Sequence, residues 1–498
     1  MTVVKNISKA LGLLVVTVAA LAALGIVWPV AQAPLPDPAD SRLIVNARIV
    51  DPENGTAGAP TSVLIRKGRI AAIGALPTGR EKLPVLDARG GYMTPGFWDM
   101  HAHTFQSSPQ LHLPLFVANG VTGMRDMMDC PGEHDALIAC LPDKRRWTRE
   151  VEEGRLASPR IIEVASFYFA RSDLRPDEAA RLASVYKARG LDSLKVYNEL
   201  PRATFLRLTD KARRLDLRVV GHLPKAVSLD EAVAAGQSSF EHAHLFVRHC
   251  FGRAADWRAG RLARIEPTAV AEAMVRERDP AACARSYAAM RAAGAWFVPT
   301  HVTREEDARA RDPAFLNDPR LAYLDPLSRW VFVSDDLPAT VAEYPGDRGR
   351  VALQRYFELG LRLTGEAYRA GVPVLVGTDT AIGGFRYHDE MALLVRAGLT
   401  PTEVLRAATV DAARYAGAQE RFGTVTVGKA ADLVILDANP LADIANTRRI
   451  RAVLLGGRLY DRGRLNDLLA FVRGQANAPA NWIKLVWGYA TSSVRSEL

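Results

Sequence analysis

Between residues 96 and 378, short apolar runs alternate with longer helix-like segments, and this alternation limits the possible folds more than any other feature. Eight of the runs have the length of strands, and helical patterns such as Arg202–Arg214 and Leu229–Ala235 separate most of them. Eight strand-then-helix units are what a closed parallel barrel needs, so we predict an α/β fold of the (β/α)8 TIM type. A doubly wound open sheet would compete, but the first unit lacks a glycine-rich phosphate loop. The predicted strands cover residues 96–101, 121–125, 160–165, 193–197, 218–222, 238–242, 295–300 and 372–378.

Other parts of the chain interrupt or flank this pattern. Residues 301–371 are long, polar and interrupted by proline, and we interpret them as a helical insertion that forms a lid. Residues 43–50 and 428–436 have the length and glycine punctuation of antiparallel strands. The C-terminal extension, residues 466–498, carries one apolar stretch at 482–487. We expect this stretch to pack on the barrel rather than on a partner or a membrane, because it is short.

The first 33 residues carry the features of an export signal. Lys5 and Lys9 precede an uncharged run rich in Leu, Val and Ala, which contains the small-x-small pattern Ala31-Gln32-Ala33. This order is typical of a secretory signal peptide, and we expect export across a bacterial inner membrane to the periplasm. The apolar part approaches the length that spans a bilayer, so an uncleaved inner-membrane anchor stays open.

Composition excludes wholesale disorder and gives nucleic-acid binding little support. Apolar residues make up 48% and charged residues 24% of the 498 residues, which is enough for a sizeable core. The formal net charge is +9, but the charges are scattered and no long Lys or Arg run stands out. We therefore predict no nucleic-acid partner.

The four cysteines are too few for a disulfide scaffold and lack the CxxC spacing of a structural zinc site. In an oxidising compartment the natural pairs are Cys130 with Cys140 and Cys250 with Cys283. Four cysteines allow three pairings, so the sequence leaves their connectivity open.

Several predicted strands end in residues that bind metals. The C-terminal ends of barrel strands are where such folds place reactive groups. His101 and His103 lie two residues apart at the end of the first strand, so their rings point to the same side. Imidazoles and carboxylates suit a divalent metal such as zinc. The other strand ends supply Lys195, His222, His242 and Asp379, with His244 as a second choice beside His242.

Lys195 and Asp379 add chemistry beyond simple ligation. Asp379 ends an apolar strand, where a carboxylate can take a proton from activated water and pass it on. A buried Lys195 would cost free energy unless its amine were neutralised or paired. A neutral amine can react with carbon dioxide to form a carbamate that bridges two cations, and burial near metals favours this reaction. A lysine that reaches outward to solvent is the alternative.

Seven motifs, at residues 95–103, 120–126, 194–197, 221–224, 240–242, 377–379 and 423–434, together resemble one known family. The chain resembles the amidohydrolase superfamily, and within it the imidazolonepropionase-related enzymes that include prolidase-like and ochratoxinase-like carboxypeptidases. The resemblance runs from about Arg42 to about Arg462. It implies a small β-sandwich built from residues 42–93 and 420–465, beside a catalytic barrel over residues 94–419.

The resemblance also implies a binuclear metal site, with zinc as the expected metal. His101, His103 and Asp379 would hold the first ion, and His222 and His242 the second. A carboxylated Lys195 would bridge the two ions, and Asp379 would act as general base and acid.

Three further residues could contact a substrate at the expected site. Tyr197 lies two residues beyond Lys195 and could bind an oxyanion or a substrate carboxylate, although packing explains it equally well. His301 departs from the family, which usually has an apolar residue at this position after the seventh strand. His301 and His388 are further candidates for substrate contact.

Three functional hypotheses follow. The first is hydrolysis of an amide bond in a dipeptide, an Xaa-Pro dipeptide or an N-acyl amino acid, by a hydroxide held between two cations. The second is a mononuclear cyclic-amide hydrolase or deaminase of the same fold, with Lys195 as a bystander. The third is a binding protein that kept the fold without activity. Homo-oligomer formation and membrane attachment by the N-terminal segment stay open.

Overall fold

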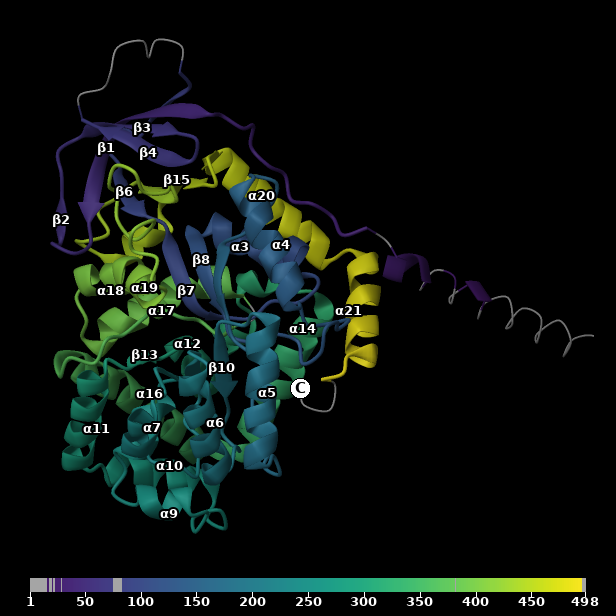
Figure 1. Cartoon of the computed structure of the whole chain (residues 1–498), viewed down its shortest axis with the longest axis vertical. Coiled ribbons are helices and arrows are strands. Elements are labelled where there is room, and N and C mark those ends of the chain that lie inside the picture. Colours follow the sequence, from purple (N-terminus) through teal and green to yellow (C-terminus); the bar gives the residue numbers. More distant parts are fainter. Residues whose placement is uncertain are drawn as a thin grey trace, which may run out of the picture.

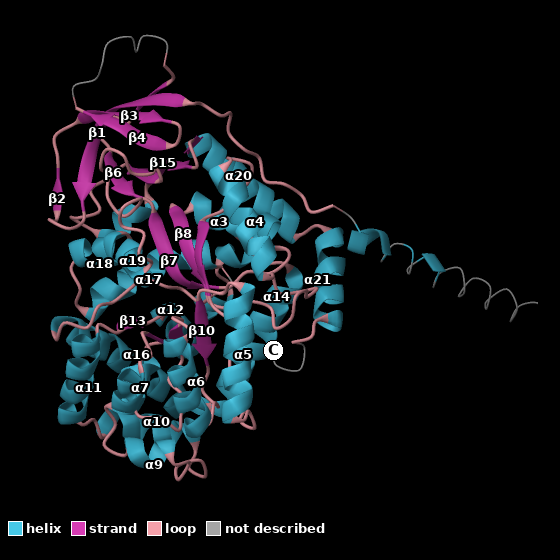
Figure 2. Ribbon diagram, in the orientation of Figure 1, coloured by secondary structure: helices cyan, strands magenta, loops and turns pink. Residues whose placement is uncertain are grey.

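The computed structural model describes residues 16–17, 20, 23–27, 29–74, 83–380 and 382–494. The predicted signal peptide or anchor, residues 1–33, therefore lies largely outside the described residues. Within these ranges, no helix combines the length and the apolar character needed to cross a membrane. The described chain forms a sheet at one end and a larger body in which helices surround central strands (Figure 1, Figure 2).

The central strands are parallel and follow one another in chain order. They are β7 (Phe97–Ala102), β8 (Val121–Asp126), β9 (Arg160–Val164), β10 (Ser193–Val196), β11 (Arg218–Gly221), β12 (Ser239–Glu241) and β13 (Trp296–Val298). Ladders join β7 to β8 to β9, β10 to β11, and β12 to β13. Single parallel bridges, Ala165 to Ser193 and Val219 to Gln237, continue the series between the ladders. This mixed α/β arrangement is consistent with a TIM-like fold.

The last predicted strand differs from expectation because residues 372–378 form no regular strand. Val374 makes a bridge to Phe297, and Met100 N donates to Val376 O at 2.8 Å, so the segment still lies between β13 and β7. The side chain of Asp99 supplies hydrogen bonds where the backbone ladder is missing. It accepts from Thr378 N at 3.0 Å and from Thr378 Oγ1 at 2.6 Å. These side-chain bonds hold the end of the segment against β7.

Helices follow most of the central strands. After β7 come α2 (Ser108–Leu111) and α3 (Leu113–Ala118), and after β8 comes α4 (Leu141–Glu152). The next three strands are followed by α5 (Pro176–Arg189), α6 (Arg202–Arg214) and α7 (Leu229–Ala235). Between β12 and β13 lie α8 (His244–His249), α9 (Ala254–Arg258), α10 (Pro267–Arg276) and α11 (Pro280–Ala293). Beyond residue 382 lie α17 (Gly383–Ala397), α18 (Pro401–Ala408) and α19 (Val410–Tyr415).

The interval 301–371 is helical throughout most of its length. It contains α12 (His301–Ala308), α13 (Pro313–Leu316), η1 (Pro319–Tyr323), α14 (Pro326–Val331), η2 (Phe332–Asp336), α15 (Leu337–Glu343) and α16 (Gly346–Arg369). Asp312, Asp318 and Asp325 cap three of these elements through their side chains. Proline therefore starts helices here rather than interrupting them.

Both ends of the chain contribute to one nine-stranded sheet with its own apolar core. Its path is β16-β15-β14-β6-β1-β3-β4, and β2 and β5 also pair with β1. The expectation of antiparallel strands holds only in part, because β1 pairs in parallel with β5 and β6. The direction of β6 is fixed by β7, which follows it after a single residue. The bounds are β1 Ser41–Asp51, β2 Thr56–Ala57, β3 Thr61–Arg66, β4 Arg69–Ile73, β5 Val85–Asp87, β6 Tyr92–Pro95, β14 Leu433–Leu436, β15 Ile450–Leu455 and β16 Arg458–Asp461.

The C-terminal extension forms two helices, α20 (Arg462–Ala476) and α21 (Pro479–Thr491), and a short turn, η3 (Ile444–Arg448), precedes β15. The apolar stretch 482–487 lies in α21. Only one side of α21 packs on the protein, through Asn481, Leu485 and Gly488. The expectation that this stretch packs on the barrel is therefore only half met.

Both predicted disulfides are present. Cys130 is bonded to Cys140 and Cys250 to Cys283, with Cα–Cα distances of 4.9 and 4.8 Å. The bonded cysteines are 10 and 33 residues apart, and both bonds lie outside the central strands.

A buried ion pair joins the central strands to the end sheet. Arg160 of β9 lies 2.7 Å from Asp432, which directly precedes β14, and their side chains are 7% and 4% exposed. Glu152, 3.4 Å from Arg160, is a second and more exposed partner. A buried guanidinium without its main partner is costly, so this pair fixes how the two parts meet.

We expect Asp432→Asn to lower the free energy of unfolding by about 3 kcal/mol, because it leaves Arg160 buried with only Glu152 beside it. Denaturant unfolding measures this change. Asp177→Asn is the matched control, since Asp177 pairs with Arg207 at an exposed site and should cost less than about 1 kcal/mol. Equal losses in the two variants would contradict the structural role of the buried pair.

Candidate metal centre

A cavity of about 1340 Å³ opens at the C-terminal ends of the central strands. It gathers side chains that lie far apart in the sequence. The predicted site residues that line it are His103, Lys195, Tyr197, His222, His242 and Asp379. His101 is fully buried next to His103 and Asp379.

His101, His103 and Asp379 form the tightest group. One donor atom from each of them lies within 4.8 Å of the other two. His103 Nε2 lies 3.0 Å from Asp379 Oδ1, and His101 Nε2 lies 3.6 Å from the same oxygen. His101 Nε2 is buried and has no hydrogen-bond partner. A buried polar atom needs a partner, and a cation placed among these three donors would supply one.

His222 and His242 form a second group beside the first. Their Nε2 atoms are only 2.9 Å apart, and His242 Nδ1 lies 3.8 Å from Asp379 Oδ2. The remaining ring nitrogens have their own partners, since His222 Nδ1 lies 3.1 Å from Asn198 Oδ1 and His242 Nδ1 lies 2.8 Å from Thr300 Oγ1. Polar partners of this kind orient imidazoles that bind metals.

The protonation states of these groups suit metal binding. Burial lowers the pKa of His103 to about 4 and that of His242 to about 3, and it holds the pKa of His222 well below its ordinary value. Burial alone would raise the pKa of Asp379, but the facing His101 and His103 outweigh it and keep this pKa well below the ordinary value. Neutral imidazoles and ionised carboxylates are the forms that ligate divalent ions.

Lys195 reaches the cavity from β10 and is only 3% exposed. Burial lowers the pKa of its amine to about 8, against the opposing effect of Asp379. The charge of Lys195 in turn lowers the pKa of both His103 and His222, so the amine lies within electrostatic reach of both histidine groups. No hydrogen bond or ion pair from the described residues holds the amine.

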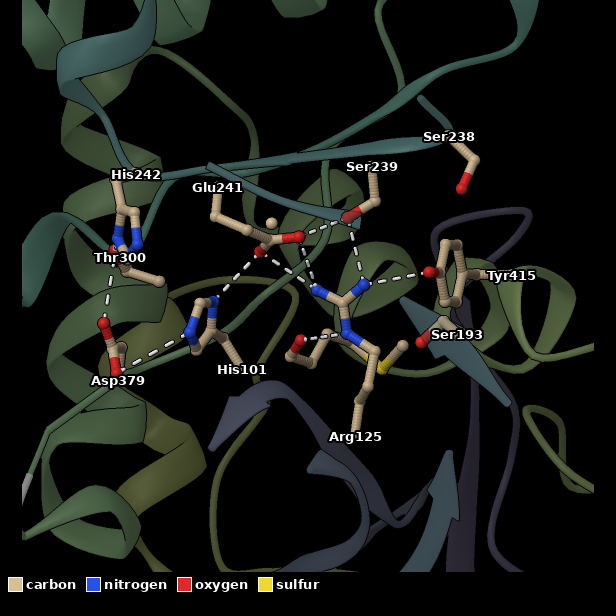
Figure 3. Close-up of polar contacts among 12 residues, drawn as sticks. His101, Arg125, Ser193, Ser238, Ser239, Glu241, His242, Thr300, Asp379 and Tyr415 are labelled. Atoms are coloured by element: carbon tan, nitrogen blue, oxygen red, sulfur yellow. Dashed lines mark hydrogen bonds and ion pairs between the residues drawn. The ribbon is translucent and has the colours of Figure 1, made fainter. Parts of the chain in front are cut away.

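A buried chain of charges orients His101 (Figure 3). Glu241 Oε2 lies 3.0 Å from His101 Nδ1, and Arg125 Nη2 donates to both oxygens of Glu241 at 2.9 Å. Burial would raise the pKa of Glu241, but Arg125 and its other neighbours bring it to about 2. Because the ionised Glu241 can only accept, Nδ1 of His101 must donate, and in the neutral form of the ring Nε2 is the nitrogen with a lone pair, which faces Asp379. The other partners of Arg125 are Ser239, Tyr415 and the carbonyl of Met100.

Unusual backbone angles cluster at the strand ends that carry this site. His242, Thr300 and Asp379 have positive φ values of 73°, 44° and 49°. Such angles cost about 1–3 kcal/mol each in residues other than glycine and persist only where the surroundings enforce them. Gly221 has φ 112°, and a Cβ there would lie 2.5 Å from Val196 O, so only glycine fits before His222.

The model of the amidohydrolase family matches residues 198–460 of this chain, which is just over half of it. The chain belongs to the amidohydrolase family.

The sequence matches between this amidohydrolase and its relatives cover different shares of the chain. It is 36% identical over 112 residues to ochratoxinase from Aspergillus niger, a match that covers 22% of this chain and 23% of that enzyme. This match therefore spans about a quarter of the relative's length. It is 26% identical over 436 residues to imidazolonepropionase from Cupriavidus metallidurans, covering 81% of this chain and 91% of the relative.

Solved structures show the same fold. The bottromycin amidohydrolase aligns with a TM-score of 0.67 and 24% identity, over 90% of this chain and 93% of that chain. A Xaa-Pro dipeptidase aligns with a TM-score of 0.57 and 17% identity, over 84% of this chain and 100% of that chain.

Amidohydrolases generally depend on metals, and the donor set here fits a divalent ion. The group of His101, His103 and Asp379 offers two imidazole nitrogens and a carboxylate, which is a ligand set found in zinc enzymes. The orphaned Nε2 of His101 points to the same conclusion.

Three other histidines have different positions. His244 begins α8 and lines the cavity, with its ring 5.5 Å from that of His242. His301 and His388 are not among the described residues that line it. His388 Nδ1 lies 3.0 Å from Thr447 Oγ1, and His301 packs near Phe357.

Sequence reasoning gave no role to Arg125, Glu241 or Asn198. A signal was available for Arg125 and Glu241, since each places a charge inside a short buried strand. Asn198 follows β10 in a loop, where asparagine is common, and carries no comparable signal. The cationic Arg248 and Arg304 and the partly buried Glu306 also line the cavity without having been predicted.

We expect Glu241→Gln to weaken divalent-metal binding by about ten- to a hundredfold, because the charge that orients His101 is lost. Metal titration followed by calorimetry measures the effect. Glu163→Gln is the matched control, since Glu163 is also buried, accepts from Ser193 at 2.7 Å and pairs with Arg218 away from the histidines. Equal losses of metal affinity in both variants would show that Glu241 acts only through general stability.

Proposed function

We propose that this amidohydrolase is exported and cleaves an amide bond in a small substrate with a free carboxylate, such as a dipeptide, an Xaa-Pro dipeptide or an N-acyl amino acid. The reaction would take place at two divalent ions, with zinc as the favoured metal, in a (β/α)8 barrel over residues 94–419. The observation that carries the proposal is the gathering of four histidines, Lys195 and Asp379 at one cavity.

Two metal positions follow from the two histidine groups. His101, His103 and Asp379 would hold one ion, and His222 and His242 the other. Two such ions would lower the pKa of water and polarise the scissile carbonyl, which are the known contributions of metals to hydrolysis. The ionised Asp379 is then the proton acceptor for the attacking water and the donor to the leaving nitrogen.

Lys195 would serve as a bridging ligand after reaction with carbon dioxide. With a pKa of about 8, a large share of its amine is neutral near pH 8. The neutral amine forms a bond to the carbon of carbon dioxide and loses one proton, which gives a carbamate with two oxygens. The resulting anion suits a position within electrostatic reach of both histidine groups better than an unpaired ammonium does.

The cavity also has the right chemistry for a carboxylate joined to an apolar group. Arg304 acts on the pKa of Tyr197 and of His242, so its charge lies near the reacting groups. A guanidinium and a phenol are suitable donors for a carboxylate. The apolar side of the cavity includes Phe105, Phe116, Leu137, Leu327, Phe332 and Leu485.

A mononuclear hydrolase of the same family is the second candidate. It is favoured by one observation: His101, His103 and Asp379 are the one group of described residues whose donors already lie close enough for a single ion. The remaining hypothesis, a binding protein without activity, is not retained, because the chain belongs to a family of hydrolases.

Lys195→Met should lower the metal content from two ions to one and reduce kcat by about a thousandfold or more, because the bridging anion is lost. Short carboxylic acids should restore part of the activity, since they can occupy the same space. Elemental analysis and rates with and without propionate measure both effects. Full metal content and activity in Lys195→Met would instead support the mononuclear enzyme.

Arg304→Met should raise KM for substrates with a free carboxylate by about ten- to a hundredfold and leave kcat within a few fold, because a charge-assisted hydrogen bond is lost. Arg171→Met is the control, since Arg171 also lies on the cavity wall and is ion-paired with Asp173 and Glu178, as Arg304 is with Asp307. Unlike Arg304, Arg171 is not among the charges that act on the pKa of Tyr197 or His242. A screen of dipeptides and N-acyl amino acids supplies the substrates. If none is hydrolysed although two metal ions are bound, cyclic amides or esters become the better candidates.

A further inference from the structure

Exposed apolar side chains are concentrated on one face of the molecule, beside the mouth of the cavity. Of fourteen large apolar side chains that are exposed among the described residues, ten lie in residues 16–30, α14 and α21. Six of them form what we call the aromatic face: Trp330, Val331, Trp482, Val486, Trp487 and Tyr489. Their exposed fractions lie between 37% and 58%. Isolated exposed apolar residues are normal, but a concentration of this kind indicates a binding surface.

The aromatic face adjoins both the cavity and the N-terminal segment. Trp330, Val331 and Tyr489 also line the cavity. Lys484 Nζ donates to Ile26 O at 2.7 Å, so the described part of the N-terminal apolar run contacts α21. Figure 1 shows the described residues of this run beside α21.

A second connection ties the same segment to the body. Ala31 N donates to Gln110 Oε1 at 2.9 Å, and Gln110 Nε2 donates to Asn481 Oδ1 at 2.7 Å. Both partners of Gln110 are therefore close to α21. Because the run is held beside α21, a membrane into which the run inserts would lie next to the aromatic face.

The composition of the face favours lipid over protein as its occupant. Tryptophan and tyrosine prefer the interface between lipid and water, where the ring is apolar on one side and hydrated on the other. The thirteen residues of α21 include Lys484 as their one charged side chain, and Arg329 is the one charged side chain of α14. The nearby acidic residues, Asp335 and Asp336 of η2, line the cavity. Arg329 and Lys484 are balanced by the exposed Asp335 and Asp336, so the aromatic and apolar side chains, rather than a net charge, favour the interface of a bilayer.

We propose that the aromatic face docks on the surface of a phospholipid bilayer, with the mouth of the cavity at the interface between lipid and water. The face contacts the same bilayer into which the N-terminal run inserts. This inference goes beyond the proposed function and does not depend on which amide the enzyme hydrolyses.

A fluorescent reporter at the face tests the proposal directly. The full chain carries Val486→Cys labelled with an environment-sensitive dye, and its native cysteines are unavailable because all four are paired. With vesicles of phosphatidylglycerol and phosphatidylethanolamine, we expect the emission to shift to the blue and to rise about twofold or more, as expected for a dye that leaves water for lipid. Val185→Cys is the matched control, because Val185 on α5 is 51% exposed and lies outside the face.

Two outcomes would overturn the proposal. In the first, the protein floats with the vesicles but the emission of the dye at Val486→Cys does not shift. This would mean that the N-terminal run binds lipid while the aromatic face stays in water. The second is a blue shift without vesicles that grows with protein concentration, which would assign the face to a second copy of the chain. Neither outcome affects the proposed hydrolase activity, which is measured separately with soluble substrates.

Discussion

The ion pair between Arg125 and Glu241 holds the site together. Arg125 on β8 and Glu241 on β12 are fully buried, and β8 and β12 are not neighbours in the series of strands. The pair therefore spans the interior between them and fixes the distance from one side to the other. Two buried charges rarely add stability by themselves, so such a pair is better explained by what it positions. Here it positions His101 and sets which ring nitrogen is free.

The positions of the other candidate metal ligands depend on where the central strands end. Parallel strands bring their C-terminal ends to one edge, which is why side chains more than 270 residues apart, such as His103 and Asp379, lie within 3.0 Å of each other. Positive φ angles at His242 and Asp379 then place the side chains at that edge. The bonds from Thr378 to Asp99 keep the irregular last segment in place where a ladder is missing.

Much of the fold and of the candidate site could be predicted from the sequence, for identifiable reasons. Seven of the eight strands were predicted to within about two residues because buried parallel strands are short apolar runs between helical patterns. Residues 372–378 have the same apolar pattern but no regular ladder, since the hydrogen bonds there go partly to a side chain. Histidine, lysine and aspartate at strand ends marked the cavity because the C-terminal ends of barrel strands are where such folds place reactive groups.

Other features could not be predicted because they depend on contacts between distant segments. Nothing local indicates that Glu241 meets His101, or that Asn198 and Thr300 orient the two other histidines. The same holds for the C-terminal extension. Its apolar stretch gave no way to tell which side of α21 packs on the protein and which stays exposed beside the N-terminal segment.

The most direct test of this account is anomalous X-ray diffraction at the zinc edge from crystals grown with zinc and bicarbonate. The account predicts two anomalous peaks, one among His101, His103 and Asp379 and one at His222 and His242, with extra density continuous with Nζ of Lys195 between them. A single peak beside an unmodified Lys195, or peaks away from these side chains, would contradict it.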